Sequence, residues 1–243
     1  MIKINKMVKL FKEFNLSDIN LIIEKGDLIA LVGDNGAGKT TLIKSIFGMV
    51  ELNSGKITFN DENIFDNNNL SRIAFFPDSN NIPLNITVEN YMKYISIVAG
   101  VNQKEFNSRV DKIIEMLEIQ AYKNKTIKKL SAGMKKRAIM AGVLITKPEF
   151  IIFDEPTANL DVEGKNEFLS IIKKLHESNV GMMITSHIIE ELQDLCNKLI
   201  ILKEGSIIYN NKFDNKKESI KNIYFKYIDK KENKYEGVKD IYE

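Results

Sequence analysis

The segment 33-GDNGAGKT-40 contains the residue types that bind phosphate groups. It matches the pattern Gly-x-x-x-x-Gly-Lys-Ser/Thr and lies between a strand-like and a helix-like stretch, which is the context that this pattern requires. Its glycines allow a tight turn in which backbone N–H groups point at phosphate oxygens. Lys39 is placed to reach the β- and γ-phosphates, and Thr40 to offer its hydroxyl to Mg²⁺. Because the flanking elements argue against a chance glycine-rich turn, the segment predicts a nucleoside triphosphate site.

Two carboxylates, those of Asp154 and Glu155, follow a second apolar stretch, 150-FIIF-153. Open parallel sheets bind ligands at the carboxyl ends of their strands, so we expect both acids to lie near the phosphates. Asp154 suits an outer-sphere or water-mediated contact with Mg²⁺, and Glu155 suits polarisation of an attacking water molecule. The alternative is a solvated acidic turn before Pro156, and the phosphate loop makes that alternative the weaker one.

A serine and a glycine, Ser131 and Gly133, lie near the start of the segment 130-LSAGMKKRAIM-140. Ser131 is a good N-cap residue, and apolar residues follow it at helical spacing. The segment is therefore expected to form a helix that is basic on one side. It is either a capped surface helix or a helix whose free N–H groups and serine hydroxyl hold an anion, because helix N-termini attract negative charge.

Strand-like and helix-like stretches alternate along the chain, which predicts an α/β fold with a mostly parallel sheet covered on both faces. The expected strands are residues 28–33, 55–60, 72–76, 150–153, 181–186 and 198–202. The expected helices are one that ends at Phe47 and is closed by Gly48, the helix after Ser131, and helices over 87–100, 105–119 and 165–178.

The helical stretch in the middle of the chain interrupts this alternation, and we interpret it as an inserted subdomain. The expected main domain covers residues 1–212, with a core at 1–84 and 146–212 and the helical subdomain at about 85–145. Residues 213–243 are rich in lysine, glutamate and tyrosine. They are expected to form a helical C-terminal extension that either closes on the sheet or regulates the protein.

Composition and charge argue against several classes of protein. The 243 residues carry a net charge of +2, so no global attraction to nucleic acid is expected. One cysteine, Cys196, cannot form an internal disulfide and is typical of a reducing compartment. The N-terminus lacks the apolar core of a signal peptide, and the longest apolar run, 138-AIMAGVLI-145, has eight residues. Because a bilayer span needs roughly 18, we expect a cytoplasmic protein that does not itself cross a membrane.

Taken in order, these motifs resemble those of the nucleotide-binding subunit of ATP-binding cassette (ABC) transporters, over roughly residues 2–210. In the family's terms the matching stretches are the Walker A loop at 33–40, the signature at 130-LSAGM-134, the Walker B strand with its catalytic glutamate at 150–155, the D-loop at 158-ANLD-161 and the switch histidine at His187. The resemblance implies a P-loop NTPase (RecA-like) core with an N-terminal antiparallel β portion and the inserted helical subdomain. It also implies Mg²⁺-dependent ATP hydrolysis coupled to transport, with Lys39, Glu155 and His187 as catalytic residues.

In this family two subunits bind head to tail, and the signature of one faces the phosphate loop of the other. The resemblance therefore implies that Ser131 and Gly133 contact the ATP of a partner subunit, which is a second copy or a related chain. Phe11 is placed like the family's adenine-stacking aromatic residue, although Phe14 is a rival and core packing would also explain an aromatic residue there. The residues implied to bind ATP within one chain are Phe11, Asn35, Gly36, Ala37, Gly38, Lys39, Thr40 and Thr41, the last through the α-phosphate.

The other implied partner is a separate integral membrane permease, which would hold this subunit at the cytoplasmic face of the membrane. The helical region at about 85–122 would be the face that meets it. There the apolar stripe Val88, Tyr91, Met92 and Ile95 belongs either to ordinary core or to that contact.

Two departures from the family's usual motifs point to a subgroup. Asp78 stands where the family has a Gln that contacts Mg²⁺, so the expected metal ligands are Thr40, Asp78 and Asp154. A turn after Pro77 is the alternative explanation of this acid. Met134 ends the signature in place of Gln. Both features resemble the ABC-2-like subgroup that is paired with export-type permeases, so we expect export.

Two other functions fit parts of the sequence. The first is a soluble ABC ATPase that acts on ribosomes or DNA, but such proteins usually carry two cassettes or a long coiled-coil insertion. This chain has one phosphate loop and a short insertion. The second is a P-loop kinase or GTPase, and the signature and D-loop argue against it.

Overall fold

The computed structural model describes residues 1–77, 82–186 and 188–228. Two of the expected site residues, Asp78 and His187, and the last part of the expected extension lie outside the described residues. Within the described residues, no helix is both long enough and apolar enough to cross a membrane.

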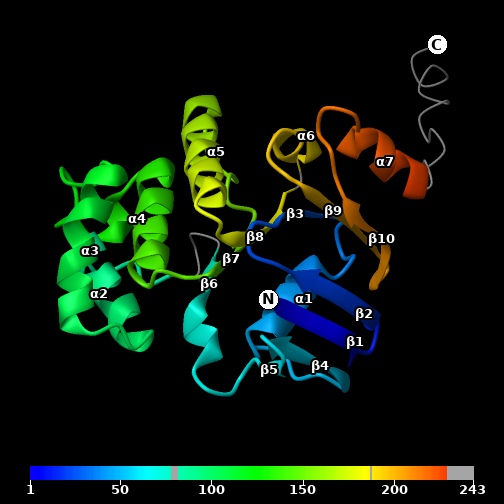
Figure 1. The fold of residues 1–243 in the computed structure, drawn as a ribbon. Coiled ribbons are helices and arrows are strands. Elements are labelled where there is room, and N and C mark those ends of the chain that lie inside the picture. Colours follow the sequence, from blue (N-terminus) through cyan, green and yellow to red (C-terminus); the bar gives the residue numbers. More distant parts are fainter. Residues whose placement is uncertain (78–81, 187, 229–243) are drawn as a thin grey trace, which may run out of the picture.

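A six-stranded sheet forms the centre of the molecule (Figure 1). Its strands run in the order β10-β9-β3-β8-β7-β6, and every neighbouring pair is parallel except β10 with β9. All residues of β3 and β8 are buried, which explains why these strands are uninterrupted apolar runs. The strands of this sheet are β3 (Leu28–Val32), β6 (Ile73–Phe76), β7 (Phe150–Asp154), β8 (Gly181–Thr185), β9 (Lys198–Lys203) and β10 (Ser206–Lys212).

A four-stranded antiparallel sheet, in the order β2-β1-β4-β5, forms the N-terminal part of the fold. Side chains of both sheets share one apolar cluster, which includes Ile4, Ile29 and Phe150. The α/β fold with an N-terminal antiparallel portion is thus confirmed. Periodicity alone located only β4, because register shifts in β1 break its alternation with β2 and β4. The strands are β1 (Ile2–Leu10), β2 (Asn15–Ile23), β4 (Ser54–Phe59) and β5 (Glu62–Asn63).

Three helices form a group at one end of the molecule, drawn in green in Figure 1. Both α2 and α3 pack on α4. Val88, Tyr91 and Met92 of the apolar stripe are buried and belong to the core, and Ile95 is partly buried against it. The helices of this group are α2 (Val88–Val98), α3 (Gln103–Met116) and α4 (Ala132–Ile145).

Capping residues set where the remaining helices begin and end. Gly48, with a φ of +68°, follows the end of α1 as predicted. The Asp161 side chain accepts a hydrogen bond from Gly164 N at 2.9 Å, so α5 begins at Val162 rather than at residue 165. The described part of the C-terminal extension contains one helix, α7. These helices are α1 (Lys39–Ile46), α5 (Val162–Glu177), α6 (Ile189–Leu192) and α7 (Ile220–Tyr227), and two 3₁₀ turns lie at Asn69–Arg72 and Ile127–Lys129.

Three aromatic rings join the main sheet to α5. Phe76 of β6, Phe153 of β7 and Phe168 of α5 lie with ring centroids 5.2 to 6.5 Å apart. All three are buried, and separations in this range are favourable for aromatic pairs. The cluster therefore fixes the strand that ends in the two acids.

Phe153→Ala should lower the free energy of unfolding by about 3–5 kcal/mol, because it removes a buried ring and leaves a cavity. Chemical denaturation measures this change. Met116→Ala is the control, since Met116 is 56% exposed at the end of α3 and should change the free energy by less than about 0.5 kcal/mol. Equal losses in the two variants would contradict the packing role of the ring.

Candidate active site

The phosphate loop connects the buried strand β3 to the first turn of α1. Gly36 and Gly38 have φ values of +83° and +106°, a conformation that residues with a Cβ disfavour. At Gly38 a Cβ would also lie 2.6 Å from side-chain atoms of Phe14 and Leu16. The backbone conformation at Gly38 therefore favours glycine, and a Cβ there would also have to displace the ends of the Phe14 and Leu16 side chains.

Lys39 begins α1, and its ammonium group is held at the loop. Nζ donates hydrogen bonds to the carbonyl oxygens of Gly33 at 2.7 Å and Asp34 at 3.2 Å. Burial of Lys39 lowers the pKa of its ammonium group, and nearby carboxylates, led by that of Glu155, oppose this shift. A cation held by neutral carbonyl groups can exchange them for phosphate oxygens, because hydrogen bonds between charged groups are stronger.

A cavity of about 690 Å³ opens over the loop. The loop residues from Asn35 to Thr41 form one wall, and Asp154 and Glu155 at the end of β7 form another. This volume lies within the roughly 300–1,000 Å³ that is usual for small-molecule sites. The cavity therefore brings together the loop and both acids that the sequence identified.

Hydroxyl groups from two neighbouring elements hold the Asp154 carboxylate. Thr185 Oγ1, at the end of β8, donates to Oδ1 at 2.7 Å, and Thr40 Oγ1 in α1 donates to Oδ2 at 3.4 Å. The parallel register pairs Asp154 directly with Thr185. A threonine oxygen beside a carboxylate has the chemistry of Mg²⁺ ligands, and Mg²⁺ at phosphates commonly needs only one or two protein carboxylates. These residues therefore fit the expected metal.

Glu155 has a backbone φ of +50°, which is unusual for a residue with a side chain. Hydrogen bonds on both sides of the residue support this conformation: its N–H donates to Thr185 Oγ1 at 3.1 Å, and its carbonyl oxygen accepts from Lys136 Nζ at 3.3 Å and from Ala158 N at 3.2 Å. Strained backbone of this kind is concentrated at functional sites, where the surroundings over-determine it. The strain and its supports fix where Glu155 enters the cavity.

Thr185 and Lys136 belong to none of the motifs found in the sequence. Thr185 is fully buried, and the available signal is a hydroxyl at the end of an apolar strand. No sequence pattern singles out Lys136, which is one of several basic residues on the helix after Ser131. It is only 2% exposed, and its Nζ lies 5.3 Å from the ring centroid of Phe76, within the range of a cation–π contact.

Of the two aromatic residues that could contact the base, Phe14 lines the cavity beside Gly38. Phe11 is 44% exposed, and its ring centroid lies 6.5 Å from that of Phe14. Phe14 therefore lines the cavity over the phosphate loop, and Phe11 does not. Adenine stacking stays a prediction for both rings.

Ser131 and Gly133 line a second cavity, of about 520 Å³, between the starts of α4 and α5. Ser131 caps α4 as predicted, with Oγ accepting from Met134 N at 3.3 Å. Among the residues that the structure describes, a Cβ at Gly133 would meet Leu160 alone, at 3.9 Å, so they leave space open in front of the helix start. One chain thus places its phosphate loop and its signature in two different cavities.

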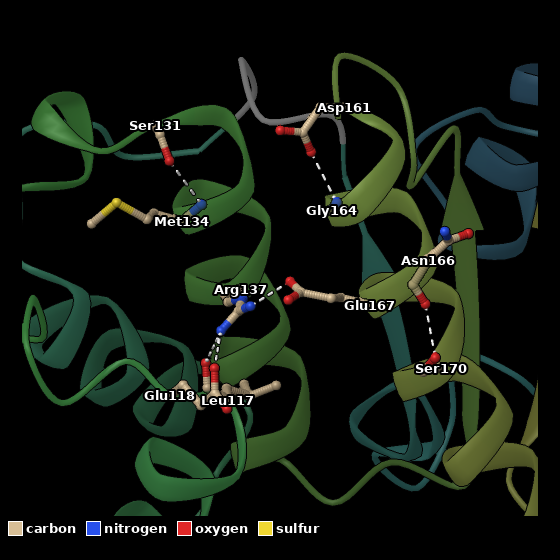
Figure 2. A network of polar contacts seen from close by, with 10 residues as sticks. All are labelled: Leu117, Glu118, Ser131, Met134, Arg137, Asp161, Gly164, Asn166, Glu167 and Ser170. Atoms are coloured by element: carbon tan, nitrogen blue, oxygen red, sulfur yellow. Dashed lines mark hydrogen bonds and ion pairs between the residues drawn. The ribbon is translucent and has the colours of Figure 1, made fainter.

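Arg137 joins the three helices around this second cavity. Its guanidinium group forms ion pairs with Glu118, after α3, and with Glu167 of α5, and it donates to the Leu117 carbonyl oxygen at 3.2 Å. Figure 2 shows the guanidinium group between the two carboxylates. The helical group is thereby tied to α5 next to the signature.

Comparisons of the sequence agree with one another. A family described as ABC transporter matches residues 16–158. The ABC transporter ATP-binding protein NatA of Bacillus subtilis is 31% identical over 217 residues, which cover 87% of each chain. The bacitracin transport ATP-binding protein BcrA of Bacillus licheniformis is 31% identical over 233 residues, which cover 94% of this chain and 75% of BcrA.

Solved structures share the fold. CbiO1 of Clostridium perfringens, described as part of the ABC transporter complex cbiONQ, is 27% identical with a TM-score of 0.76, over 87% of this chain and 88% of CbiO1. An ATP-binding subunit of an ABC transporter has a TM-score of 0.84 over 93% of this chain and 99% of its own. Because the two sequences are only 21% identical, the similarity to this second structure shows the fold alone.

Thr185→Val should lower the free energy of unfolding by about 1–3 kcal/mol, because Asp154 and the Glu155 N–H each lose a hydrogen bond in a buried setting. Denaturant titration measures this loss. Thr185→Ser keeps the hydroxyl and is the matched control, with a smaller loss expected. A loss in the valine variant that is no larger than the loss in the serine variant would contradict the role given to the hydroxyl group.

Proposed function

The chain belongs to the ABC transporter family as an ATP-binding ATPase subunit, and we propose that its ATP hydrolysis drives transport through a separate membrane permease. The observation that carries this proposal is the division of the site. The phosphate loop and the acids line one cavity, and Ser131 and Gly133 line another. Each chain therefore holds both halves of an ATP site but does not place them on one nucleotide.

We infer that two such subunits bind head to tail and complete each other's sites. The start of α4, with its free N–H groups and the Ser131 hydroxyl, would then face a γ-phosphate held by the partner. ATP would stabilise the dimer by binding both subunits, and hydrolysis would remove charge that holds the signature in place. The partner is a second copy or a related chain.

Within one chain, the residues around the first cavity would divide the work of hydrolysis. Loop N–H groups would bind the phosphate oxygens, and Lys39 would leave the Gly33 and Asp34 carbonyl groups for the β- and γ-phosphates. Glu155 would polarise the water that attacks the γ-phosphorus. Thr185 would position Glu155 through its backbone N–H.

Thr40 and Asp154 are the described residues that would hold Mg²⁺, which would supply neutralisation of phosphate charge when bound. Asp78 as a further metal ligand is proposed from the sequence alone. The contact of His187 with the γ-phosphate is likewise a proposal from the sequence.

A groove between the core and the helical group is the docking site that we propose for the permease. Its volume is about 330 Å³, and its apolar lining includes Phe47, Phe75 and Tyr91. Val98, also in the lining, is 69% exposed, and its neighbour Ile97 is 66% exposed. An amphipathic helix on the cytoplasmic side of a membrane protein fits such a groove, because its apolar face would cover these side chains.

The direction of transport that we propose is export. Met134 ends the signature and lines the second cavity, and Asp78 replaces a usual glutamine. Both resemble features of export-type systems. The relative BcrA is named for bacitracin transport.

Glu155→Gln should still bind ATP and should accumulate the closed dimer, because the phosphate contacts remain while the base is lost. Hydrolysis should fall by about 10²–10⁴-fold. Phosphate release measures turnover, and light scattering with ATP measures the dimer. Lys39→Ala is the control, in which neither ATP binding nor dimer formation is expected. Rapid hydrolysis by the glutamine variant would contradict the catalytic role proposed for Glu155.

Val98→Asp should abolish co-purification with a membrane protein from detergent, because it buries a carboxylate in an apolar contact. Met116→Asp is the control, since Met116 is exposed on α3 and does not line the groove. Mass spectrometry of the purified complex identifies the partner. Recovery of the wild-type chain only with ribosomes or DNA would favour the soluble ABC ATPase instead.

A further inference from the structure

The C-terminal helix α7 contacts the phosphate loop through one hydrogen bond. Tyr224 Oη donates to Asp34 Oδ1 at 2.8 Å, across 190 residues of sequence. Tyr224 is half-buried and packs against the main apolar core. The hydroxyl is protonated at neutral pH, as in an ordinary tyrosine, and burial and the Asp34 carboxylate raise its pKa further, to about 12.

The helix that carries Tyr224 is held firmly on α6, beside which it lies in Figure 1. Ile220 is fully buried, and its N–H donates to Gln193 Oε1 at 2.9 Å. Gln193 Nε2 donates in turn to the carbonyl oxygen of Glu218 at 2.8 Å. Lys221 forms an ion pair with Glu190 of α6 at 3.3 Å. These contacts fix the position from which Tyr224 reaches the loop.

On the loop, the backbone and the side chain of Asp34 have different partners. The backbone carbonyl oxygen accepts hydrogen bonds from Ala37 N at 3.1 Å and from Lys39 Nζ at 3.2 Å. The residue lines a cavity of about 830 Å³ together with Lys203 and Glu204, and it does not line the 690 Å³ cavity. Tyr224 therefore holds the carboxylate on the outer side of the loop.

A carboxylate next to a triphosphate site has two effects when nothing holds it. It competes with the phosphates for the same lysine, and it repels their negative charge. The Asp34 carboxylate is close enough to Lys39 to raise the pKa of that ammonium group, against the larger effect of burial. A hydrogen bond that keeps this carboxylate turned outward therefore favours phosphate binding.

We propose that Tyr224 is a positioning residue for the phosphate loop, and that α7 thereby strengthens ATP binding by holding the Asp34 carboxylate away from Lys39. This inference rests on the assignment of the first cavity as the ATP site. It gives the C-terminal extension a role in nucleotide affinity in addition to closing on the sheet.

Tyr224→Phe tests the proposal, because it removes only the hydroxyl. The Kd for ATP and the KM should rise about three- to tenfold, while kcat stays within about twofold. Titration calorimetry on the full chain measures Kd, and steady-state hydrolysis separates KM from kcat. Tyr227→Phe is the matched control, since Tyr227 is on the same helix and packs on Tyr209 with ring centroids 5.1 Å apart. That variant should leave Kd unchanged.

Asp34→Ala provides a second test through a double-mutant cycle. In that background Tyr224→Phe should no longer weaken ATP binding, because the carboxylate that the hydroxyl holds is gone. An equal loss in both backgrounds would show that ring packing is responsible and would overturn the proposal. Equal Kd values for Tyr224→Phe and Tyr227→Phe would also overturn it. If the wild-type chain itself bound no ATP, the proposed function would fall, and this inference with it.

Discussion

The parallel pairing of β7 with β8, and of β8 with β3, is the constraint on which the rest of the structure depends. It brings the carboxyl ends of three strands to one edge of the sheet, although they are far apart in the sequence. β3 leads into the phosphate loop, β7 ends in Asp154, and β8 ends in Thr185. A shift of one residue in the β7–β8 register would separate Thr185 from Asp154 and turn one of them to the other face.

In the resulting site, the charged side chains are held by neutral carbonyl and hydroxyl groups, which a bound nucleotide could replace as hydrogen-bond partners. Lys39 donates hydrogen bonds to two carbonyl oxygens, and the Asp154 carboxylate accepts hydrogen bonds from two hydroxyl groups. Glu155 stands in a strained conformation held by Thr185 and by Lys136. Because Lys136 belongs to α4, the helix that carries the signature is connected to the strand end that carries the acids.

Sequence reasoning located the phosphate loop, the acids and the Ser131 cap, because each depends on a local pattern. The turn at Gly38, the strand end at Asp154 and the N-cap at Ser131 require particular residue types at fixed spacing. It assigned no role to Lys136 or to Thr185, and it left the choice between Phe11 and Phe14 open. Each of these depends on what lies across the fold, such as the Phe76 ring beside Lys136. The apolar pattern predicts that α5 starts at residue 165, whereas the polar cap Asp161 starts the helix at Val162.

By itself the sequence determined the α/β class, the chemistry of the loop and the acids, and membership of a family with ordered motifs. These follow from short segments whose residue types limit their own backbone and chemistry. Only the tertiary structure decided that the signature and the loop line separate cavities, and that Tyr224 reaches Asp34. Such contacts join residues that are distant in sequence. Their geometry depends on how the sheet, α5 and α7 pack together, and this packing cannot be predicted from a local sequence pattern.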